Sequence, residues 1–227
     1  MTKSVIPPSP SDAAYKHNAA YKAVKKANQT PMFDRSDPLA LFSEWLEEAK
    51  SKEENDANAM AVATVDADGL PDVRMVLLKG FDDRGFVFYS HKNSAKGIQL
   101  RANNKAALNF HWKSLRRQVR IRGDVTMVGK AEIGAYFASR AREAQIGAWA
   151  SKQSKGLKNR GVFEKAMDEL RIKFKGASVP LPPGWKGWRV EPKQIEFWRD
   201  KPFRLHDRLL FTRDNQADEW ETSRLYP

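Results

Sequence analysis

The sequence contains no cysteine, and it has only four histidines among 227 residues. Without cysteine the chain cannot form disulfides, use a thiol nucleophile, or hold zinc or an iron–sulfur cluster through cysteine ligands. The histidines, His17, His91, His111 and His206, do not have the spacing of metal ligands. The sequence therefore predicts no metal site.

Long apolar runs are also missing. No segment of the sequence approaches the ~20 consecutive apolar residues that span a bilayer. The N-terminal stretch MTKSVIPPSPSD has no apolar core of the kind found in signal peptides. We therefore expect a soluble, cytoplasmic protein without a membrane partner.

Acidic residues are few relative to basic ones. The sequence has 28 Asp and Glu and 40 Lys and Arg, which gives a formal net charge of +12. Such an excess indicates an anionic partner: nucleic acid, a membrane surface or a phosphorylated small molecule. The basic residues are spread through many segments rather than gathered in one nucleic-acid-binding motif. A basic nucleic-acid binder is therefore the least favoured interpretation.

The length suits one domain of ordinary size with a tail. Residues 1–34 are rich in Pro, Ser, Ala and Lys and show no sustained apolar face, which is typical of a flexible N-terminal arm. The apolar patterns of a folded domain begin after this arm and continue to the end of the chain. We expect the folded domain to cover residues 35–227.

The folded part has the pattern of an α+β protein dominated by antiparallel strands. Residues 36–55 predict an amphipathic helix, with Ser36 or Asp37 as N-cap and Pro38 in the first turn. Short β-branched and aromatic runs separated by Asp-Gly and Arg-Gly turns favour a small barrel over an open parallel sheet. We expect strands at 59–66, 71–80, 85–90, 105–112 and 116–129, helices at 94–103, 130–150 and 159–176, and strands again in the C-terminal region.

Three basic residues in the first half of the chain could meet a phosphate. In the predicted strand RMVLLK, Arg74 and Lys79 fall on opposite faces because side chains alternate. Taken alone, this pattern favours two cations that extend to water from the ends of a buried strand. Lys96 lies at the start of a predicted helix, where free backbone N–H groups and the helix dipole favour an anion.

Polar residues in the second half could also bind a ligand. Gln118 shares a predicted strand face with several arginines, whose simplest role is a solvated barrel wall, but its amide suits the edge of a heterocycle. Tyr136 and Arg140 are placed on one face of the predicted helix, either as a phosphate clamp or as an aromatic ring packed under an arginine. Gln153 and Ser154 could bind a phosphate or cap the next element.

Together, these motifs resemble the pyridoxine (pyridoxamine) 5′-phosphate oxidase family over about residues 37–227. Their common order along the chain makes the resemblance far more specific than any single motif. The matching segments are RMVLLKGFDDRGFVFYS, RRQVRIRG, YFASR, QIGAWASKQS, VPLPPGWKGWRVEP, QIEFW, RLHDR and the terminal RLYP.

The resemblance implies a homodimeric FMN-binding split β-barrel with the flavin at the subunit interface. It also implies an enzyme that oxidises pyridoxamine 5′-phosphate or pyridoxine 5′-phosphate to pyridoxal 5′-phosphate. A hydride would pass from the substrate carbon to the flavin, and dioxygen would reoxidise the flavin and release hydrogen peroxide. The protein would mainly position and polarise the reactants, so we assign no obligatory general base.

The same resemblance implies the cofactor site. Arg74 and Lys96 would bind the FMN phosphate. Gln118 would meet the flavin ring, and Gln153 and Ser154 would come from the partner subunit. The full set of cofactor residues is Arg74, Met75, Val76, Leu77, Leu78, Lys79, Tyr89, Ser90, Lys96, Gln118, Gln153, Ser154, Trp198 and Arg208.

The substrate site implied by the resemblance has two parts. The substrate phosphate would be held by Lys79, Tyr136 and Arg140, and the pyridine ring would be covered by Arg204, Leu205 and His206. Arg204 would orient the reacting centre as the main catalytic residue, with His206 beside it. Both parts should line one cavity next to the flavin.

Two positions depart from the family pattern. Ala95 replaces an arginine that commonly precedes the lysine matching Lys96, and Ala144 replaces a hydroxyl-bearing residue of the substrate-phosphate site. A lost charged hydrogen bond is typically worth ~1.5–3 kcal/mol, so weaker binding is expected but function is not excluded. The departures support one alternative: an FMN- or pyridoxal-phosphate-binding split-barrel protein without oxidase activity.

Overall fold

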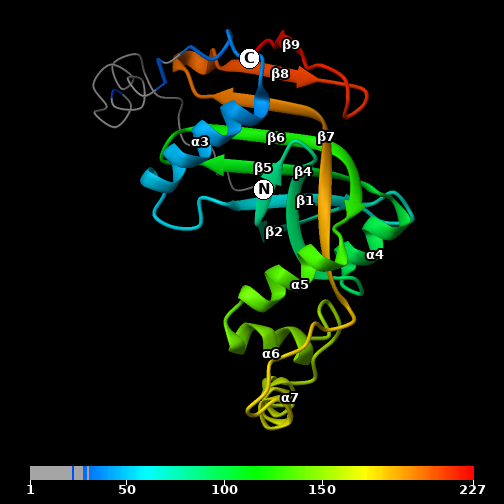
Figure 1. Cartoon of the computed structure of the whole chain (residues 1–227). Helices are drawn as coiled ribbons and strands as arrows, with labels where there is room; N and C mark the ends of the chain where they lie inside the picture. The colour runs from blue at the N-terminus through cyan, green and yellow to red at the C-terminus, as the bar shows by residue number, and fades with distance from the viewer. Residues whose placement is uncertain (1–21, 23–27, 30) are drawn as a thin grey trace, which may run out of the picture.

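The computed structural model describes residues 22, 28–29 and 31–227. Most of the predicted arm, residues 1–34, therefore lies outside the described residues. The described residues form one nine-stranded antiparallel sheet that curls on itself, in the order β2-β1-β5-β6-β7-β4-β3, with β8 paired to β7 and β9 to β8 (Figure 1). The strands are β1 (Ala59–Val65), β2 (Pro71–Leu77), β3 (Gly80–Asp82), β4 (Gly85–His91), β5 (Lys105–Trp112), β6 (Arg117–Met127), β7 (Trp185–Arg199), β8 (Asp207–Thr212) and β9 (Glu221–Arg224).

Five α-helices accompany this sheet in the described residues. They are α3 (Pro38–Lys52), α4 (Ala95–Ala102), α5 (Lys130–Ser139), α6 (Arg142–Ala150) and α7 (Arg160–Lys173), with a short 3-10 turn η1 (Pro202–Arg204). The predicted mainly antiparallel α+β class is confirmed.

The main core lies between α3 and the inner face of the sheet. Of the two predicted N-caps, Asp37 is the one that caps α3, because its Oδ1 accepts hydrogen bonds from the backbone N–H of Leu39 at 2.8 Å and of Ala40 at 3.1 Å. Phe42 on the buried face of α3 packs edge-to-face against Phe86 and Phe110, with ring centroids 5.0 and 5.1 Å apart. Burying one such side chain stabilises the fold by about 1.5–3 kcal/mol, so this aromatic cluster anchors the helix to the sheet.

The long strand β7 joins the two halves of the sheet. It pairs with β4 at its N-terminal end and with β6 along the rest of its length. The register with β6 shifts between Arg122 and Gly123, and a Cβ on Gly123 would lie 1.8 Å from the carbonyl oxygen of Glu191. Only glycine allows this close approach, which marks the bulge where β6 bends along β7.

The single helix predicted for residues 130–150 is wrong, because Arg140 and Ala141 have non-helical backbones and separate α5 from α6. The side-chain amide of Gln145 donates to the carbonyl oxygens of Phe137 at 2.9 Å and of Ala138 at 3.1 Å. These bonds satisfy carbonyl oxygens at the end of α5, which the backbone N–H groups of the next turn would satisfy if the helix continued. Arg140 therefore follows the helix and does not share a helical face with Tyr136.

Two strand predictions also need correction. The predicted strand 71–80 is interrupted: β2 ends at Leu77, Leu78 is buried in the core, and Lys79 bonds through its backbone N–H to Val87 of β4 at 2.8 Å. Arg116 lies in the turn before β6 with φ of 51°, so it does not share a strand face with Gln118.

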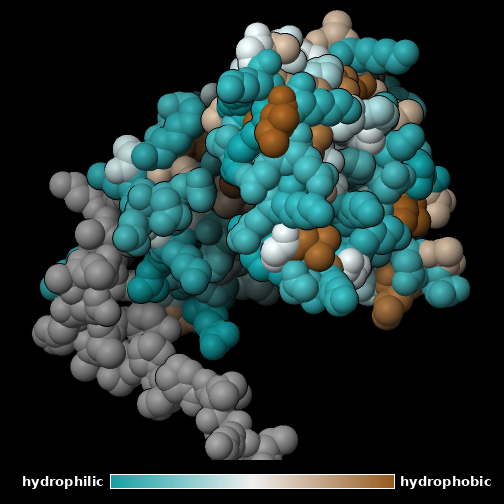
Figure 2. Space-filling model, turned by 90° about the horizontal axis from the view of Figure 1, so that it is seen from below, coloured by the Kyte–Doolittle hydropathy of each residue, from teal (hydrophilic) through white to brown (hydrophobic). Residues whose placement is uncertain are grey.

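The helices α5, α6 and α7 form a lobe below the sheet with a small core of its own, which includes Phe137, Ile146 and Phe174. Seen from below, the surface is mostly hydrophilic, and apolar side chains occur in scattered small groups (Figure 2). Scattered apolar residues of this kind are normal for a protein surface. Within the described part of the chain, no helix has the length and apolar character needed to cross a membrane.

Candidate functional site

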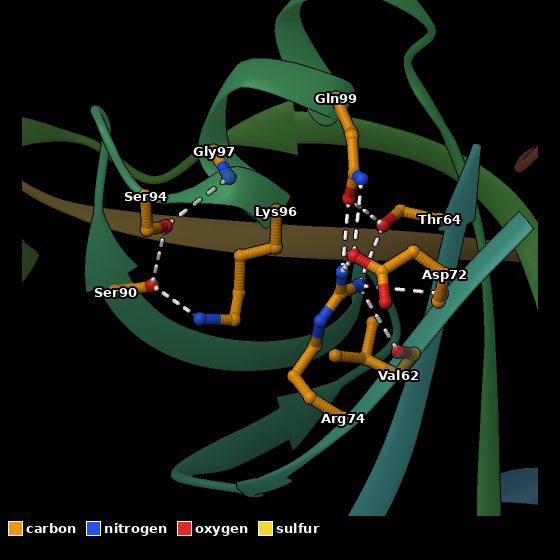
Figure 3. Close-up of polar contacts among 9 residues, drawn as sticks. All are labelled: Val62, Thr64, Asp72, Arg74, Ser90, Ser94, Lys96, Gly97 and Gln99. Atoms are coloured by element: carbon orange, nitrogen blue, oxygen red, sulfur yellow. Dashed lines mark hydrogen bonds and ion pairs between the residues drawn. The ribbon is translucent and has the colours of Figure 1, made fainter. Parts of the chain in front are cut away.

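A buried lysine lies at the start of α4, near the end of β4 (Figure 3). Lys96 is 7% exposed, and its Nζ donates to Ser90 Oγ at 3.2 Å. Ser94 caps α4 by accepting from the backbone N–H of Gly97 at 3.3 Å, as the predicted helix start requires. Among the described residues no carboxylate pairs with Lys96. Burial lowers the pKa of Lys96, and the positive charge of Arg74 lowers it further.

A buried cation of this kind requires a counter-ion. Lys96 has three N–H donors and a neutral partner in Ser90, and it lies at a helix N-terminus. A phosphate fits this arrangement because it would supply negative charge and acceptor oxygens to the ammonium of Lys96 and to the backbone N–H groups at the start of α4. The structure thus brings together Lys96, predicted for the FMN phosphate, and Ser90, predicted for the flavin-binding strands. Ala95, the first residue of α4, contributes no charge there.

Arg74, the other cation predicted for the FMN phosphate, points from β2 toward α4 (Figure 3). Its guanidinium pairs with the carboxylate of Asp72. It also donates to Gln99 Oε1 at 2.9 Å and to Thr64 Oγ1 at 2.6 Å. Arg74 therefore reaches the predicted phosphate region already bound to several groups of its own chain.

Gln153 extends the region around Lys96. Its Oε1 accepts from Ser90 Oγ and from the backbone N–H of His91, both at 3.2 Å. Ser154 follows with φ of 68°. Both residues therefore lie near β4 of their own chain, and their predicted role toward a partner's flavin stays a prediction.

A second cation site lies between α5 and the first residue of β7. The guanidinium carbon of Arg140 is 4.3 Å from the ring centroid of Trp185. Arg140 NH1 and Trp185 Nε1 are both buried without a hydrogen-bond partner among the described residues. Burial lowers the pKa of Arg140. Two unsatisfied donors side by side, one of them charged, fit an anionic ligand.

Tyr136 lies close to this second site. Its ring stacks on Tyr89 of β4 with centroids 4.0 Å apart and an interplanar angle of 12°. This contact joins a residue predicted for the flavin strand to one predicted for the substrate phosphate. Ala144, in the first turn of α6, offers no hydroxyl to the site.

Trp185 was not predicted as a site residue. It stands inside the matching segment VPLPPGWKGWRVEP, but a tryptophan there is equally explained by packing. Its unsatisfied indole N–H is visible only once Arg140 is placed against it.

A third group lies across the far end of β7. Gln118 of β6 pairs in register with Trp198 of β7, which pairs in turn with Arg208 of β8. Residues in register point to the same face of a sheet, so these three predicted flavin residues form one row. Arg208 is held by Glu196 and by the backbone carbonyl of Tyr226, which accepts from NH1 at 3.0 Å.

The residues predicted for the pyridine ring lie next to this row. The ring of His206 is 4.5 Å from that of Trp198, and its Nδ1 accepts from the backbone N–H of Lys201 at 3.2 Å. Arg204 lies in η1 with φ of 60°, a left-handed conformation that is unfavourable for arginine. Leu205 is 64% exposed. This strained turn presents Arg204 and Leu205 to solvent.

The remaining predicted residues follow β2. Met75 and Leu77 are exposed on its outer face, whereas Val76 packs against the core and Leu78 lies within it. Lys79 lines a cavity of about 490 Å³ between the end of α3 and the start of β3.

The expectation that both parts of the substrate site line one cavity is not met within one chain. Arg140 lies against Trp185 at the first residue of β7, and His206 lies against Trp198 near its last residue. In Figure 1 β7 begins at the bottom, near α5, and ends at the top, beside β8.

Two family models together match most of the chain. Residues 46–174 match the family model described as pyridoxamine 5′-phosphate oxidase. Residues 185–227, which include β7, β8 and β9, match the model of the pyridoxine 5′-phosphate oxidase C-terminal dimerisation region. The chain belongs to the pyridoxamine 5′-phosphate oxidase family.

Individual relatives cover nearly the whole chain. It is 58% identical to a pyridoxine/pyridoxamine 5′-phosphate oxidase of Caulobacter vibrioides (strain NA1000 / CB15N), over 99% of this chain and 98% of that protein. It is 61% identical to the oxidase of the same name from Bradyrhizobium diazoefficiens, over 88% of this chain and 96% of that protein.

Two solved structures share the fold. PhzG from Burkholderia lata 383, crystallised with tetrahydrophenazine-1-carboxylic acid, is 31% identical with a TM-score of 0.80, over 86% of this chain and 94% of that one. An FMN-binding protein related to pyridoxamine 5′-phosphate oxidase from Nostoc punctiforme has a TM-score of 0.68 at 19% identity, over 86% of this chain and 100% of that one. The predicted split-barrel fold is confirmed.

Proposed function

We propose that the chain is an FMN-dependent oxidase that converts pyridoxine 5′-phosphate or pyridoxamine 5′-phosphate to pyridoxal 5′-phosphate, with dioxygen as the acceptor and hydrogen peroxide as a product. Family membership and relatives of the same name at about 60% identity support this activity. The structural observation that carries the proposal is a pair of cations without a counter-ion among the described residues: Lys96, which is buried, and Arg140, whose NH1 is buried without a partner. One suits the phosphate of a cofactor and the other the phosphate of a substrate.

FMN, when bound, supplies the redox chemistry by accepting a hydride from the substrate and passing the electrons to dioxygen. Lys96, Ser90 and Arg74 would hold its phosphate. Gln118 and Arg208 would face the flavin ring from the row across β6 and β8. The protein's own contribution is to bind and orient both reactants.

The substrate residues act from both ends of β7. Arg140, with Tyr136 and the indole N–H of Trp185, would bind the substrate phosphate, and Lys79 is proposed to join them. Arg204 and His206 would cover the pyridine ring, with Leu205 between them.

The enzyme works as a homodimer, in which β7–β9 belong to the dimerisation region of the family. In a symmetric dimer, the Arg140 end of one chain can meet the Arg204 end of the other. We further propose that residues 35–227 form the oxidase domain behind an N-terminal arm of residues 1–34, and that the protein is cytoplasmic.

A visible spectrum of the purified protein tests the function. A flavin band that bleaches on anaerobic addition of pyridoxine 5′-phosphate, and returns with peroxide when air is admitted, is the expected result. Unphosphorylated pyridoxine at the same concentration is the control and should bleach the band far less. A protein that binds FMN but shows no bleaching would instead be a binding protein without oxidase activity, the alternative to which Ala95 and Ala144 lend support.

A further inference from the structure

The carboxylate of Asp72 lies inside the region proposed for the FMN phosphate (Figure 3). Asp72 and Arg74 are two residues apart on β2 and project from the same face, where they form an ion pair. Gln99 of α4 also donates from Nε2 to Asp72 Oδ2 at 3.1 Å. An acidic group thus stands where an anionic ligand is to bind.

The hydrogen bonds of Arg74 show the consequence of this placement. Its NH1 donates to Thr64 Oγ1 at 2.6 Å and to the carbonyl oxygen of Val62 at 3.3 Å. Its NH2 donates to Asp72 and, at 2.9 Å, to Gln99 Oε1. Each terminal nitrogen of a guanidinium carries two N–H groups, so both already have their full number of partners.

Lys96 contrasts with Arg74. Its ammonium has three donors, and among the described residues Ser90 is the hydrogen-bond partner found for it. Lys96 can therefore meet a phosphate without breaking an ion pair. Arg74 can offer its terminal nitrogens NH1 and NH2 to a phosphate only by giving up the carboxylate of Asp72 or a neutral partner.

We propose that Asp72 competes with the FMN phosphate for Arg74 and so lowers the affinity of the protein for FMN. The inference rests on the proposed function, because it takes FMN as the cofactor of this site. The hydrogen bond from Gln99 and the charge of Arg74 both lower the pKa of Asp72, so the competing group is an anion at neutral pH.

The local charge count makes the effect of Asp72 large. Arg74 and Lys96 contribute two positive charges, and Asp72 removes one of them, which leaves a formal charge of +1. Ala95 adds no further cation. Removing the carboxylate would double the net charge that faces a phosphate.

The test compares FMN with riboflavin, which lacks the phosphate. Apoprotein is titrated with each flavin, and binding is followed by flavin fluorescence, for the wild type, Asp72→Asn and Asp72→Ala. Asp68→Asn is the matched control, because Asp68 is an exposed acidic residue in the turn before β2. We expect both Asp72 variants to lower the Kd for FMN by roughly fivefold, the size of one charge interaction in a solvated site. The Kd for riboflavin and both constants of the Asp68 variant should stay unchanged.

The two substitutions also separate competition from positioning. Asparagine keeps an acceptor oxygen for Arg74 and removes the charge, whereas alanine removes both. If Asp72 served to position Arg74, Asp72→Ala would weaken FMN binding and Asp72→Asn would leave it unchanged, and the proposal would be overturned. Equal changes for FMN and riboflavin would overturn it too. A wild-type protein that binds neither flavin would instead reject the proposed function itself.

Discussion

Glu196 accepts a hydrogen bond from Nε of Arg208 at 2.8 Å, and its second carboxylate oxygen pairs with Arg120. The Glu196 side chain is 4% exposed, and its two arginine partners lower its pKa against the opposing effect of burial. A buried carboxylate between two arginines fixes the direction of both guanidinium groups. Arg208, which is proposed to face the flavin, is thus oriented by a residue that itself need not touch the cofactor.

We predict that Glu196→Gln weakens FMN binding because Arg208 loses its charged partner. A hydrogen bond to a charged group is worth about 1.5–3 kcal/mol, which corresponds to a roughly 10- to 100-fold higher Kd if the whole effect reaches the cofactor. Flavin titration of the apoprotein measures it. Glu191→Gln on the same strand is the control, since Glu191 accepts from Thr126 Oγ1 and is remote from Arg208 in register. Unchanged FMN affinity in Glu196→Gln would refute the positioning role.

Arg140→Ala should impair substrate binding without removing the cofactor. The variant loses the charged donor that lies against Trp185, so KM for pyridoxine 5′-phosphate should rise about 10- to 100-fold. The FMN content, read from the flavin absorbance, should stay at the wild-type level. Arg160→Ala is the control, because Arg160 is an exposed residue at the start of α7. Loss of FMN together with activity would show that Arg140 serves the cofactor instead.

Much of this structure follows from local sequence patterns. The cap at Asp37 and the alternating apolar runs of β5 and β6 are determined by neighbouring residues, and they were predicted correctly. The break at Arg140 was missed because it depends on Gln145 folding back onto the end of α5. The wrong placement of Arg116 has a similar cause, since its backbone lies in a turn with positive φ and accepts a hydrogen bond from the backbone N–H of Asp200, which is remote in sequence.

The sequence predicts which residues belong to the candidate site, but it does not predict how they are arranged in space. The resemblance supplied Lys96, Arg140 and His206, but sequence order does not reveal that Arg140 and His206 lie at opposite ends of β7. It also gave no reason to single out Trp185 or Asp72. Trp185 matters because its indole N–H has no hydrogen-bond partner, and Asp72 matters because it pairs with Arg74. Both relationships exist only in the folded chain.

The lowered pKa of Lys96 predicts a pH dependence of FMN binding. Phosphate binding favours the charged lysine and raises its pKa, so binding takes up a proton between the lower pKa of the free protein and the higher pKa of the complex. Above the second ionisation of the FMN phosphate, near pH ~6, affinity should be constant while Lys96 is charged in both states, and it should fall as the pH rises through the pKa of the free protein. This fall should begin below the ordinary lysine value of 10.5.

Titrations with FMN and riboflavin across the alkaline range provide the measurement. The Kd for riboflavin divided by the Kd for FMN is the quantity to compare, because this ratio cancels any ionisation of the flavin ring that both ligands share. In Lys96→Met the ratio should be smaller than in the wild type at neutral pH, and it should no longer change over this range. A wild-type ratio that stays constant up to pH 10.5 would contradict the assignment of Lys96 to the phosphate.

The separation of Arg140 from Arg204 along the chain predicts complementation between inactive variants. Arg140→Ala and Arg204→Ala homodimers should each have low activity, because every site lacks one of the two side chains. Arg204→Ala should lose turnover much more than FMN content. In a heterodimer of the two variants, one site combines the intact Arg140 of one chain with the intact Arg204 of the other, and the second site carries both substitutions.

Co-expression of the two variants with different affinity tags allows the heterodimer to be isolated and assayed. Its activity should be about half that of the wild-type dimer, because one of two sites is restored. Random mixing without purification should give about a quarter, since about half of the dimers are then mixed. A heterodimer as inactive as either parent would show that both arginines act from the same chain, which would require a rearrangement of β7 that brings its two ends together.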